Sequence, residues 1–299
     1  MNIASRTPAS FGNTPADGRL SAATRVGGVH LQVSDLARSI GYYRDVIGLR
    51  VIEMSADAAT LGVSESAESL VTLHAKPGTR PARRRGAFGL FHFAILLPDR
   101  EALGRFAAHL ASTGVHVGMS DHTVSEALYL SDPDGLGIEV YADRPRSTWR
   151  QIDGQLVMTT DPLDVDDLVR AAAGQTWDGA PVRTTMGHVH LHVGNLEQAA
   201  AFYQRGVGFD ITVWTYPGAL FFSAGGYHHH LGTNVWAPGP APTANQARLL
   251  EWTLVVPSAT EARVIGQRLR NTVAPVVEAG EDWLVTDPWG TRLRISPRR

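Results

Sequence analysis

The stretch "GGVHLQVSDLARSIGYYRDVIGLRV", residues 27–51, has a second version in the same chain, "GHVHLHVGNLEQAAAFYQRGVGFDI", residues 187–211. The two versions align without a gap, and a glycine stands at the same place near the end of each, Gly48 and Gly208. Each version predicts a strand of alternating polarity, a helix cap at Ser34-Asp35 or Asn195, a helix, and a glycine stop before the next strand. The chain is therefore built from an internal repeat.

A second pair of repeated stretches extends the pattern. "FHFAILLPD" (91–99) is similar to "EWTLVVPSA" (251–259), and "LYLSDPDGLGIEVY" (128–141) is similar to "WLVTDPWGTRLRIS" (283–296). In the two later stretches an Asp-Pro-x-Gly turn joins two strands. The sequence thus predicts an α+β protein of four strand-helix-strand-strand-strand units, at residues 26–76, 86–142, 186–237 and 247–297.

One such unit cannot bury both faces of its own sheet, so two units are expected to close around a shared cavity. Residues 26–142 hold the first pair of units and residues 186–299 hold the second pair. Residues 143–185 are expected to be a linker with one short helix around "DVDDLVRAAAG", capped by Asp161 or Asp164. Residues 1–25 are polar and are expected to be a disordered tail.

The composition limits the possible functions. The chain has 299 residues, 43% of them hydrophobic, and a formal net charge of −2, which offers no general attraction to nucleic acid or to an acidic membrane. The sequence shows no secretory leader and no apolar run long enough to span a bilayer, so a cytoplasmic protein is expected. Without cysteine, a bound metal would have to be held by His, Asp or Glu.

Three residues stand out at corresponding places in the repeats. His92 and His188 lie on first strands, and Glu139 lies four residues after the glycine of an Asp-Pro-x-Gly turn. Taken singly, each is more often a hydrogen-bonded core residue or a solvated residue than a ligand. Together they form a set of two histidines and one carboxylate, which holds non-haem Fe(II) on one face and leaves other positions open.

The same chain resembles the vicinal-oxygen-chelate superfamily, and within it the two-domain type I extradiol dioxygenases of the catechol 2,3-dioxygenase kind. The stretches that show the resemblance are "FHFAILLPDR", "DHTVSEALYLSDPDGLGIEVYADRPRSTW", "GHVHLHV" and "SAGGYHHHLGTNVW". The resemblance implies two open barrels of the glyoxalase and extradiol-dioxygenase type. It also implies Fe(II), with Mn(II) as the other option, a small aromatic diol and O2 as substrates, and a homo-oligomer. The expected product is a ring-opened compound of the 2-hydroxymuconic semialdehyde type.

The resemblance also implies roles for individual residues. The ligand positions fall on His92, Glu139 and His188. A catalytic histidine in a His-x-aliphatic-small segment falls on His229, which is expected to point into the cavity while His228 and His230 face the other way. Further expected positions are listed here: Tyr129 as a hydrogen-bond donor to the substrate, His122 as a substrate contact or an ordinary loop residue, and His190 and His192 as pocket residues.

One feature departs from the family pattern. Well-known members hold all three ligands on units three and four, whereas unit four here has Glu251 and Arg294 at the corresponding positions. A cationic Arg294 would repel a divalent ion. We therefore expect units two and three to share the metal-bearing barrel, and Glu251 and Arg294 to form an ion pair in the barrel of units one and four.

Two other functions fit parts of the pattern. Another metalloenzyme on the same scaffold, such as a glyoxalase or epimerase, would use a different metal and often a fourth protein ligand. A metal-free small-molecule binding protein of the bleomycin-resistance type would not need the ligand set at all.

Overall fold

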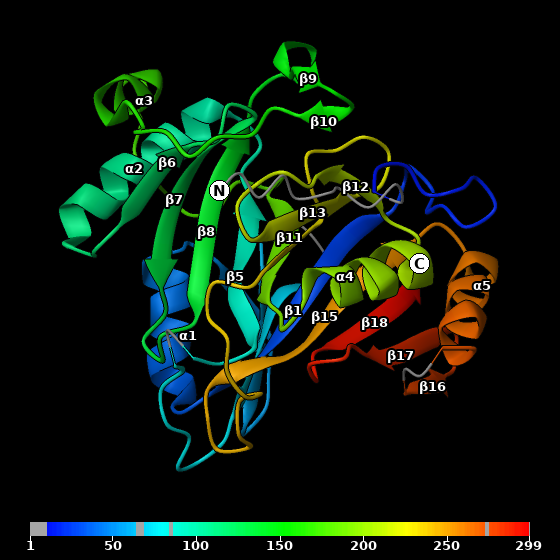
Figure 1. Cartoon of the computed structure of the whole chain (residues 1–299). Coiled ribbons are helices and arrows are strands. Elements are labelled where there is room, and N and C mark those ends of the chain that lie inside the picture. Colours follow the sequence, from blue (N-terminus) through cyan, green and yellow to red (C-terminus); the bar gives the residue numbers. More distant parts are fainter. Residues whose placement is uncertain (1–10, 64–68, 84–85, 273–274, 299) are drawn as a thin grey trace.

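A computed structural model describes residues 11–63, 69–83, 86–272 and 275–298. These residues form two eight-stranded sheets, each with parallel and antiparallel neighbours, and a separate two-stranded hairpin (Figure 1). Among them, no helix has both the length and the apolar character needed to cross a membrane. The fold is the predicted α+β arrangement of repeated units.

The four units have one order of elements. Unit one comprises β1 (Arg25–Val33), α1 (Leu36–Asp45), β2 (Arg50–Met54), β3 (Ala58–Gly62) and β4 (Ser69–Ala75). Unit two comprises β5 (Gly89–Leu96), α2 (Arg100–Thr113), β6 (Gly118–Asp121), β7 (Ser125–Ser131) and β8 (Gly137–Asp143). Unit three comprises β11 (Thr185–His192), α4 (Leu196–Ala199), its π-helical continuation η2 (Ala200–Val207), β12 (Asp210–Val213), β13 (Ala219–Ser223) and β14 (Leu231–Asn234). Unit four comprises β15 (Arg248–Val256), α5 (Ala259–Arg270), β16 (Val276–Ala279), β17 (Asp282–Thr286) and β18 (Arg292–Pro297).

Each sheet takes one unit from either half of the chain. The first sheet has the order β16-β17-β18-β15-β1-β4-β3-β2, and the second has the order β12-β13-β14-β11-β5-β8-β7-β6. At the centre of the first sheet β1 pairs antiparallel with β15, and at the centre of the second β5 pairs antiparallel with β11. Units two and three therefore share one sheet, and units one and four share the other.

The helix boundaries follow the repeated sequence signals. The Asp35 and Asn195 side chains cap α1 and α4 by accepting hydrogen bonds from backbone N–H groups three residues on. Gly208 ends η2 with a φ of 109°, and a Cβ there would lie 2.3 Å from the carbonyl oxygen of Gly18. Glycine is needed at this position both for the left-handed backbone and for the close approach.

The N-terminal segment 11–24 differs from the expected disordered tail. Leu20 is buried, its N–H donates to the Gly208 carbonyl, and the Thr14 hydroxyl donates to the Phe209 carbonyl. Residues 1–10 lie outside the described residues. The polar composition concealed a segment that satisfies backbone groups at the end of η2 in unit three.

The connection between the halves spans residues 144–184. It contains a short 3₁₀ turn η1 (Arg146–Thr148), the hairpin β9 (Gln151–Ile152) and β10 (Gln155–Leu156), and helix α3 (Val165–Ala171), which packs against α2 of unit two. Of the two expected caps, Asp164 accepts the hydrogen bond from the Asp167 N–H at the start of α3.

A tyrosine from one unit anchors the Asp-Pro-x-Gly turn of the next. The buried Asp287 carboxylate accepts hydrogen bonds from the backbone N–H groups of Trp289 and Thr291, and from the Tyr203 hydroxyl at 2.8 Å. Tyr43 makes the corresponding bond to Asp132 in the first half. The repeat thus preserves a contact that locks each turn against the helix of the preceding unit.

Tyr203→Phe is expected to lower the free energy of unfolding by about 1–2 kcal/mol, because the buried Asp287 carboxylate loses one donor and keeps two. Urea denaturation followed by circular dichroism measures the change. Tyr42→Phe is the matched control, since the Tyr42 hydroxyl is buried and has no hydrogen-bond partner among the described residues. Equal losses in the two variants would show that the Tyr203–Asp287 bond contributes nothing.

Candidate metal centre and pocket

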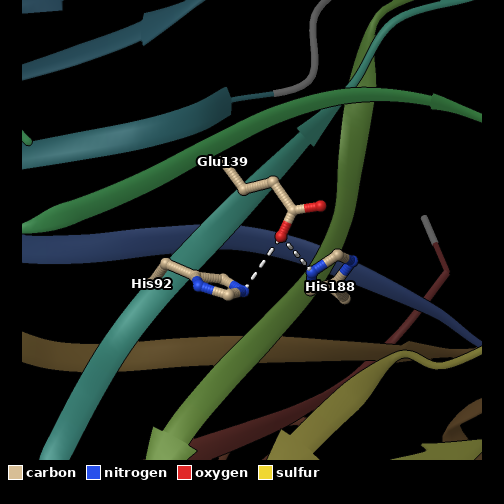
Figure 2. Close-up of side chains that lie close together, drawn as sticks. All are labelled: His92, Glu139 and His188. Atoms are coloured by element: carbon tan, nitrogen blue, oxygen red, sulfur yellow. Dashed lines mark hydrogen bonds and ion pairs between the residues drawn. The ribbon is translucent and has the colours of Figure 1, made fainter. Parts of the chain in front are cut away.

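Two histidines and a glutamate meet on the inner face of the second sheet. His92 lies on β5, Glu139 on the neighbouring β8, and His188 on β11 on the other side of β5. Their ligand atoms all lie within 4.8 Å of one another, and Figure 2 shows the two rings and the carboxylate directed at a common point. Oε2 of Glu139 lies 3.0 Å from Nε2 of His92 and 3.1 Å from Nε2 of His188.

The sheet register explains why the three side chains meet. Ala94 on β5 stands opposite Glu139 on one side and opposite His188 on the other. His92 is two residues before Ala94, so it lies on the same face of the strand. The small Ala94 side chain leaves the space between the three larger ones open.

Burial governs the charges in this cluster. All three residues are at most 5% exposed. Burial would raise the pKa of Glu139, but His188 and His92 outweigh it and hold the Glu139 pKa well below its usual range. Burial also lowers the pKa of His188, despite the attraction of Glu139. At neutral pH the cluster therefore combines an ionised carboxylate with a neutral imidazole at His188.

This donor set fits a divalent cation. Nε2 of His92 is buried and has no hydrogen-bond partner among the described residues, although it lies close to the carboxylate. An unpaired buried nitrogen, a second imidazole and a buried negative charge all favour a cation between them. Imidazole and carboxylate ligands suit iron, manganese and zinc rather than a soft metal.

A cavity of about 270 Å³ opens beside the cluster. His92 and Glu139 form part of its wall, and most of its remaining surface is apolar or aromatic. Its other lining residues include Phe91, His122, Tyr129, Met158, Thr159, Thr160, His190, Tyr216, Phe221, His229 and Trp236.

His229 lines this cavity. Its ring lies 4.0 Å from the His188 ring, centroid to centroid, and 4.9 Å from the Phe221 ring. Burial and the neighbouring imidazoles hold the pKa of His229 well below its usual value, so its ring is neutral at neutral pH. The backbone differs from the expected extended run, because β14 begins only at Leu231 and His229 lies in the preceding loop.

Tyr129 and His122 form a hydrogen-bonded pair at the cavity wall. Nδ1 of His122 lies 2.6 Å from the Thr159 carbonyl oxygen, which can only accept, so Nδ1 bears a hydrogen. Nε2 of a neutral His122 then accepts from the Tyr129 hydroxyl at 2.6 Å. In this state the Tyr129 hydrogen is engaged by His122. Donation from Tyr129 to a substrate oxygen, as expected from the resemblance, requires His122 to hold a second proton.

His190 and His192 differ in their surroundings. Nε2 of His190 accepts a hydrogen bond from the Asn234 amide, and the Asn234 amide oxygen accepts from Nδ1 of His192. His190 lines the cavity beside the cluster, whereas His192 lines a neighbouring cavity that shares Phe91 and His92 with the first. The register shift between His190 and Leu191 interrupts the regular alternation of the strand.

The corresponding place in the first sheet holds an ion pair. Nε of Arg294 donates to the Glu251 carboxylate at 2.5 Å, and Nη1 of Arg294 donates to Asp282 at 2.9 Å. This confirms the expected ion pair between Glu251 and Arg294. In that sheet a guanidinium supplies the positive charge among the carboxylates.

Several pocket residues had no signal in the sequence. Met158, Thr159 and Thr160 come from the linker, and the Thr160 hydroxyl is hydrogen-bonded to the Tyr216 hydroxyl at 2.7 Å. The linker lies outside the repeat, so comparing the units with one another could not place it.

The fold and the site define the class of protein. The family model described as the Glyoxalase/Bleomycin resistance protein/Dioxygenase superfamily matches residues 25–140 and 185–294, and the chain belongs to this superfamily. More particularly, the chain is 43% identical over 270 residues to a catechol-2,3-dioxygenase of Bacillus subtilis (strain 168). The aligned region covers 89% of this chain and 94% of that protein.

Solved structures support the fold. A crystal structure from Bacillus subtilis subsp. subtilis str. 168 with a provisional dioxygenase description matches with a TM-score of 0.67 at 12% identity, over 93% of this chain and 86% of that chain. Glyoxalase I from Zea mays matches with a TM-score of 0.56 at 16% identity, over 91% of this chain and 92% of that chain.

Proposed function

We propose that the protein is an extradiol dioxygenase that cleaves the ring of catechol or a substituted catechol with O2. Both oxygen atoms of O2 enter the product, a compound of the 2-hydroxymuconic semialdehyde type. The observation that carries the proposal is the buried His92, Glu139 and His188 cluster, which opens onto an aromatic-lined cavity. The similarity to a catechol-2,3-dioxygenase points in the same direction.

His92, Glu139 and His188 would hold the metal, Fe(II) in the first instance and Mn(II) as the other option. When bound, the ion supplies a Lewis-acidic centre for the two diol oxygens and a route for electrons between the ring and O2. The negative charge of Glu139 would keep the overall positive charge of the loaded site low.

His229 is placed to accept a proton from a diol hydroxyl. Its ring faces the cavity and is neutral at neutral pH, as a base requires. Tyr129 lines the cavity, and its hydroxyl is hydrogen-bonded to His122. While it donates to a neutral His122, the Tyr129 oxygen can accept a hydrogen bond from a second substrate hydroxyl. If His122 carries a second proton, the Tyr129 hydroxyl can donate to the substrate oxygen instead.

The cavity favours a single-ring substrate. Its volume of about 270 Å³ lies at the small end of ligand pockets. Phe91, Phe221 and Trp236 offer ring faces and edges to an aromatic substrate.

The test is reconstitution of the purified protein with Fe(II) under anaerobic conditions, followed by catechol and then air. Oxygen uptake equal to substrate loss and a yellow ring-opened product are expected. A parallel sample with Mn(II) identifies the metal. A third sample with the hemithioacetal of methylglyoxal and glutathione tests for a glyoxalase, and turnover there without oxygen uptake on any catechol would contradict the proposal.

A further inference from the structure

The histidine that faces the cavity is backed by a second histidine and an aspartate. Nδ1 of His229 lies 2.7 Å from Nδ1 of His228, and Nε2 of His228 lies 3.0 Å from Oδ1 of Asp143. His228 is fully buried, while the Asp143 side chain is 27% exposed at the end of β8. The three residues form a continuous hydrogen-bonded line from the cavity toward the surface.

The direction of these hydrogen bonds follows from their chemistry. The Asp143 carboxylate can only accept, so Nε2 of His228 bears the hydrogen. Nδ1 of a neutral His228 then has a free lone pair and accepts from Nδ1–H of His229. With its hydrogen on Nδ1, a neutral His229 has its lone pair on Nε2. Asp143 therefore determines, through His228, which nitrogen of His229 can act as a base.

Neighbouring side chains hold this line in place. The Tyr227 hydroxyl donates to Oδ1 of Asp143 at 3.2 Å, and the Tyr141 hydroxyl is hydrogen-bonded to that of Tyr227 at 2.7 Å. The His228 ring packs against Tyr227, at 4.1 Å between centroids, and against Trp149, at 5.5 Å. An imidazole packed against two aromatic rings and hydrogen-bonded at both nitrogens has little freedom to turn over.

The third histidine of the run has a different environment. Nδ1 of His230 accepts from the Ala224 N–H, and its ring packs on Tyr227 and Phe209. No hydrogen bond among the described residues joins His230 to His229. His230 thus has a packing role in the same loop. A variant at His230 removes a buried imidazole without breaking the hydrogen bonds between His229, His228 and Asp143, so it serves as a control.

We propose that His228 and Asp143 are positioning residues that hold His229 in the Nδ1–H tautomer, so that Nε2 is free to accept the substrate proton. The inference rests on the proposed function of His229 as the base for a diol. In serine proteases an aspartate fixes the tautomer of the catalytic histidine by the same logic, there without an intervening imidazole.

The experiment has two parts. The first is ¹H–¹⁵N long-range correlation NMR on metal-free protein labelled with ¹⁵N-histidine, which reports the tautomer of each neutral ring. The wild type is expected to show His229 with a hydrogen on Nδ1 and none on Nε2. In His228→Phe the Nδ1 acceptor is lost, and His229 is expected to shift toward the Nε2–H form.

The second part is steady-state kinetics of the Fe(II)-loaded protein with catechol. His228→Phe is expected to lower kcat by about 10- to 100-fold with KM changed by less than about 3-fold, since proton transfer by a positioned base is worth about 10²–10⁴-fold. His228→Asn, which places an amide oxygen within reach of Nδ1 of His229, is expected to recover part of both the tautomer and kcat. His230→Phe is expected to leave the His229 tautomer and kcat as in the wild type.

Two results would overturn the inference. One is a wild-type His229 protonated on Nε2, and the other is a His228→Phe variant with normal kcat. If no catechol is turned over by any variant while the tautomers are as expected, the proposed function fails and the hydrogen-bonded line stands. The two failures are therefore distinguishable.

Discussion

Glu139→Gln is expected to weaken Fe(II) binding by more than about 100-fold and to abolish ring cleavage. Changes to groups that merely support a metal ligand cost about 10- to 100-fold in affinity, so loss of the one charged ligand exceeds that range. Glu139 supplies the only carboxylate oxygen of the cluster, and the amide leaves the two imidazoles without a negative partner. Competition with a chelator of known affinity gives the dissociation constant, and elemental analysis after dialysis gives the metal content.

Glu126→Gln is the matched control for this variant. Glu126 is also a buried glutamate of the second sheet, but it is paired with Arg100 and Arg144 instead of the two histidines. Its replacement is expected to cost stability and to leave the affinity for Fe(II) unchanged. Equal loss of metal in the two variants would mean that the effect of Glu139→Gln comes from general damage to the sheet.

His229→Gln is expected to lower kcat by about 10²- to 10⁴-fold while the protein keeps its metal. Glutamine fills much of the same space but cannot accept a proton near neutral pH. Because His229 is not one of the clustered donors, Fe(II) content and affinity are expected to match those of the wild type. Single-turnover measurements with catechol under air give the rate of the chemical step.

Two comparisons make the result for His229→Gln decisive. His230→Phe removes the neighbouring imidazole of the same loop and is expected to retain normal turnover. A His229→Gln variant with wild-type kcat would exclude His229 as the base, whatever the state of the metal. A variant that also loses Fe(II) would place His229 in the metal site.

Much of the fold could be predicted from the sequence because the repeat is preserved in short-range signals. The caps at Asp35 and Asn195, the stop at Gly208 and the Asp-Pro-x-Gly turns each determine local geometry within a few residues. The packing of residues 11–24 could not be predicted in this way. That segment is ordered by backbone groups of Gly208 and Phe209 and by the carboxylates of Asp210 and Glu261, all of which are distant from it in the sequence.

The candidate site shows the same division. Strand parity and the repeat brought His92, Glu139 and His188 to one face, and the structure places them together. Strand alternation did not apply to the histidine run because residues 227–230 are not in a strand. It also placed His190 and His192 on one face, because it could not show the irregularity of the strand between His190 and Leu191. The part of the cavity wall that the linker supplies, and the hydrogen bond between Asp143 and His228, depend on tertiary packing between segments that share no sequence pattern.

The central pairing of each sheet also has a consequence for how the chain is made. β1 and β5 are synthesised long before their partners β15 and β11, because the paired strands are far apart in the sequence. Val29 on β1, for example, pairs with Trp252 on β15. Until those partners are made, the nascent first half exposes two inner strand edges whose unpaired backbone groups can join those of other chains. Truncated or stalled products of this gene are therefore expected to aggregate or to be retained by chaperones.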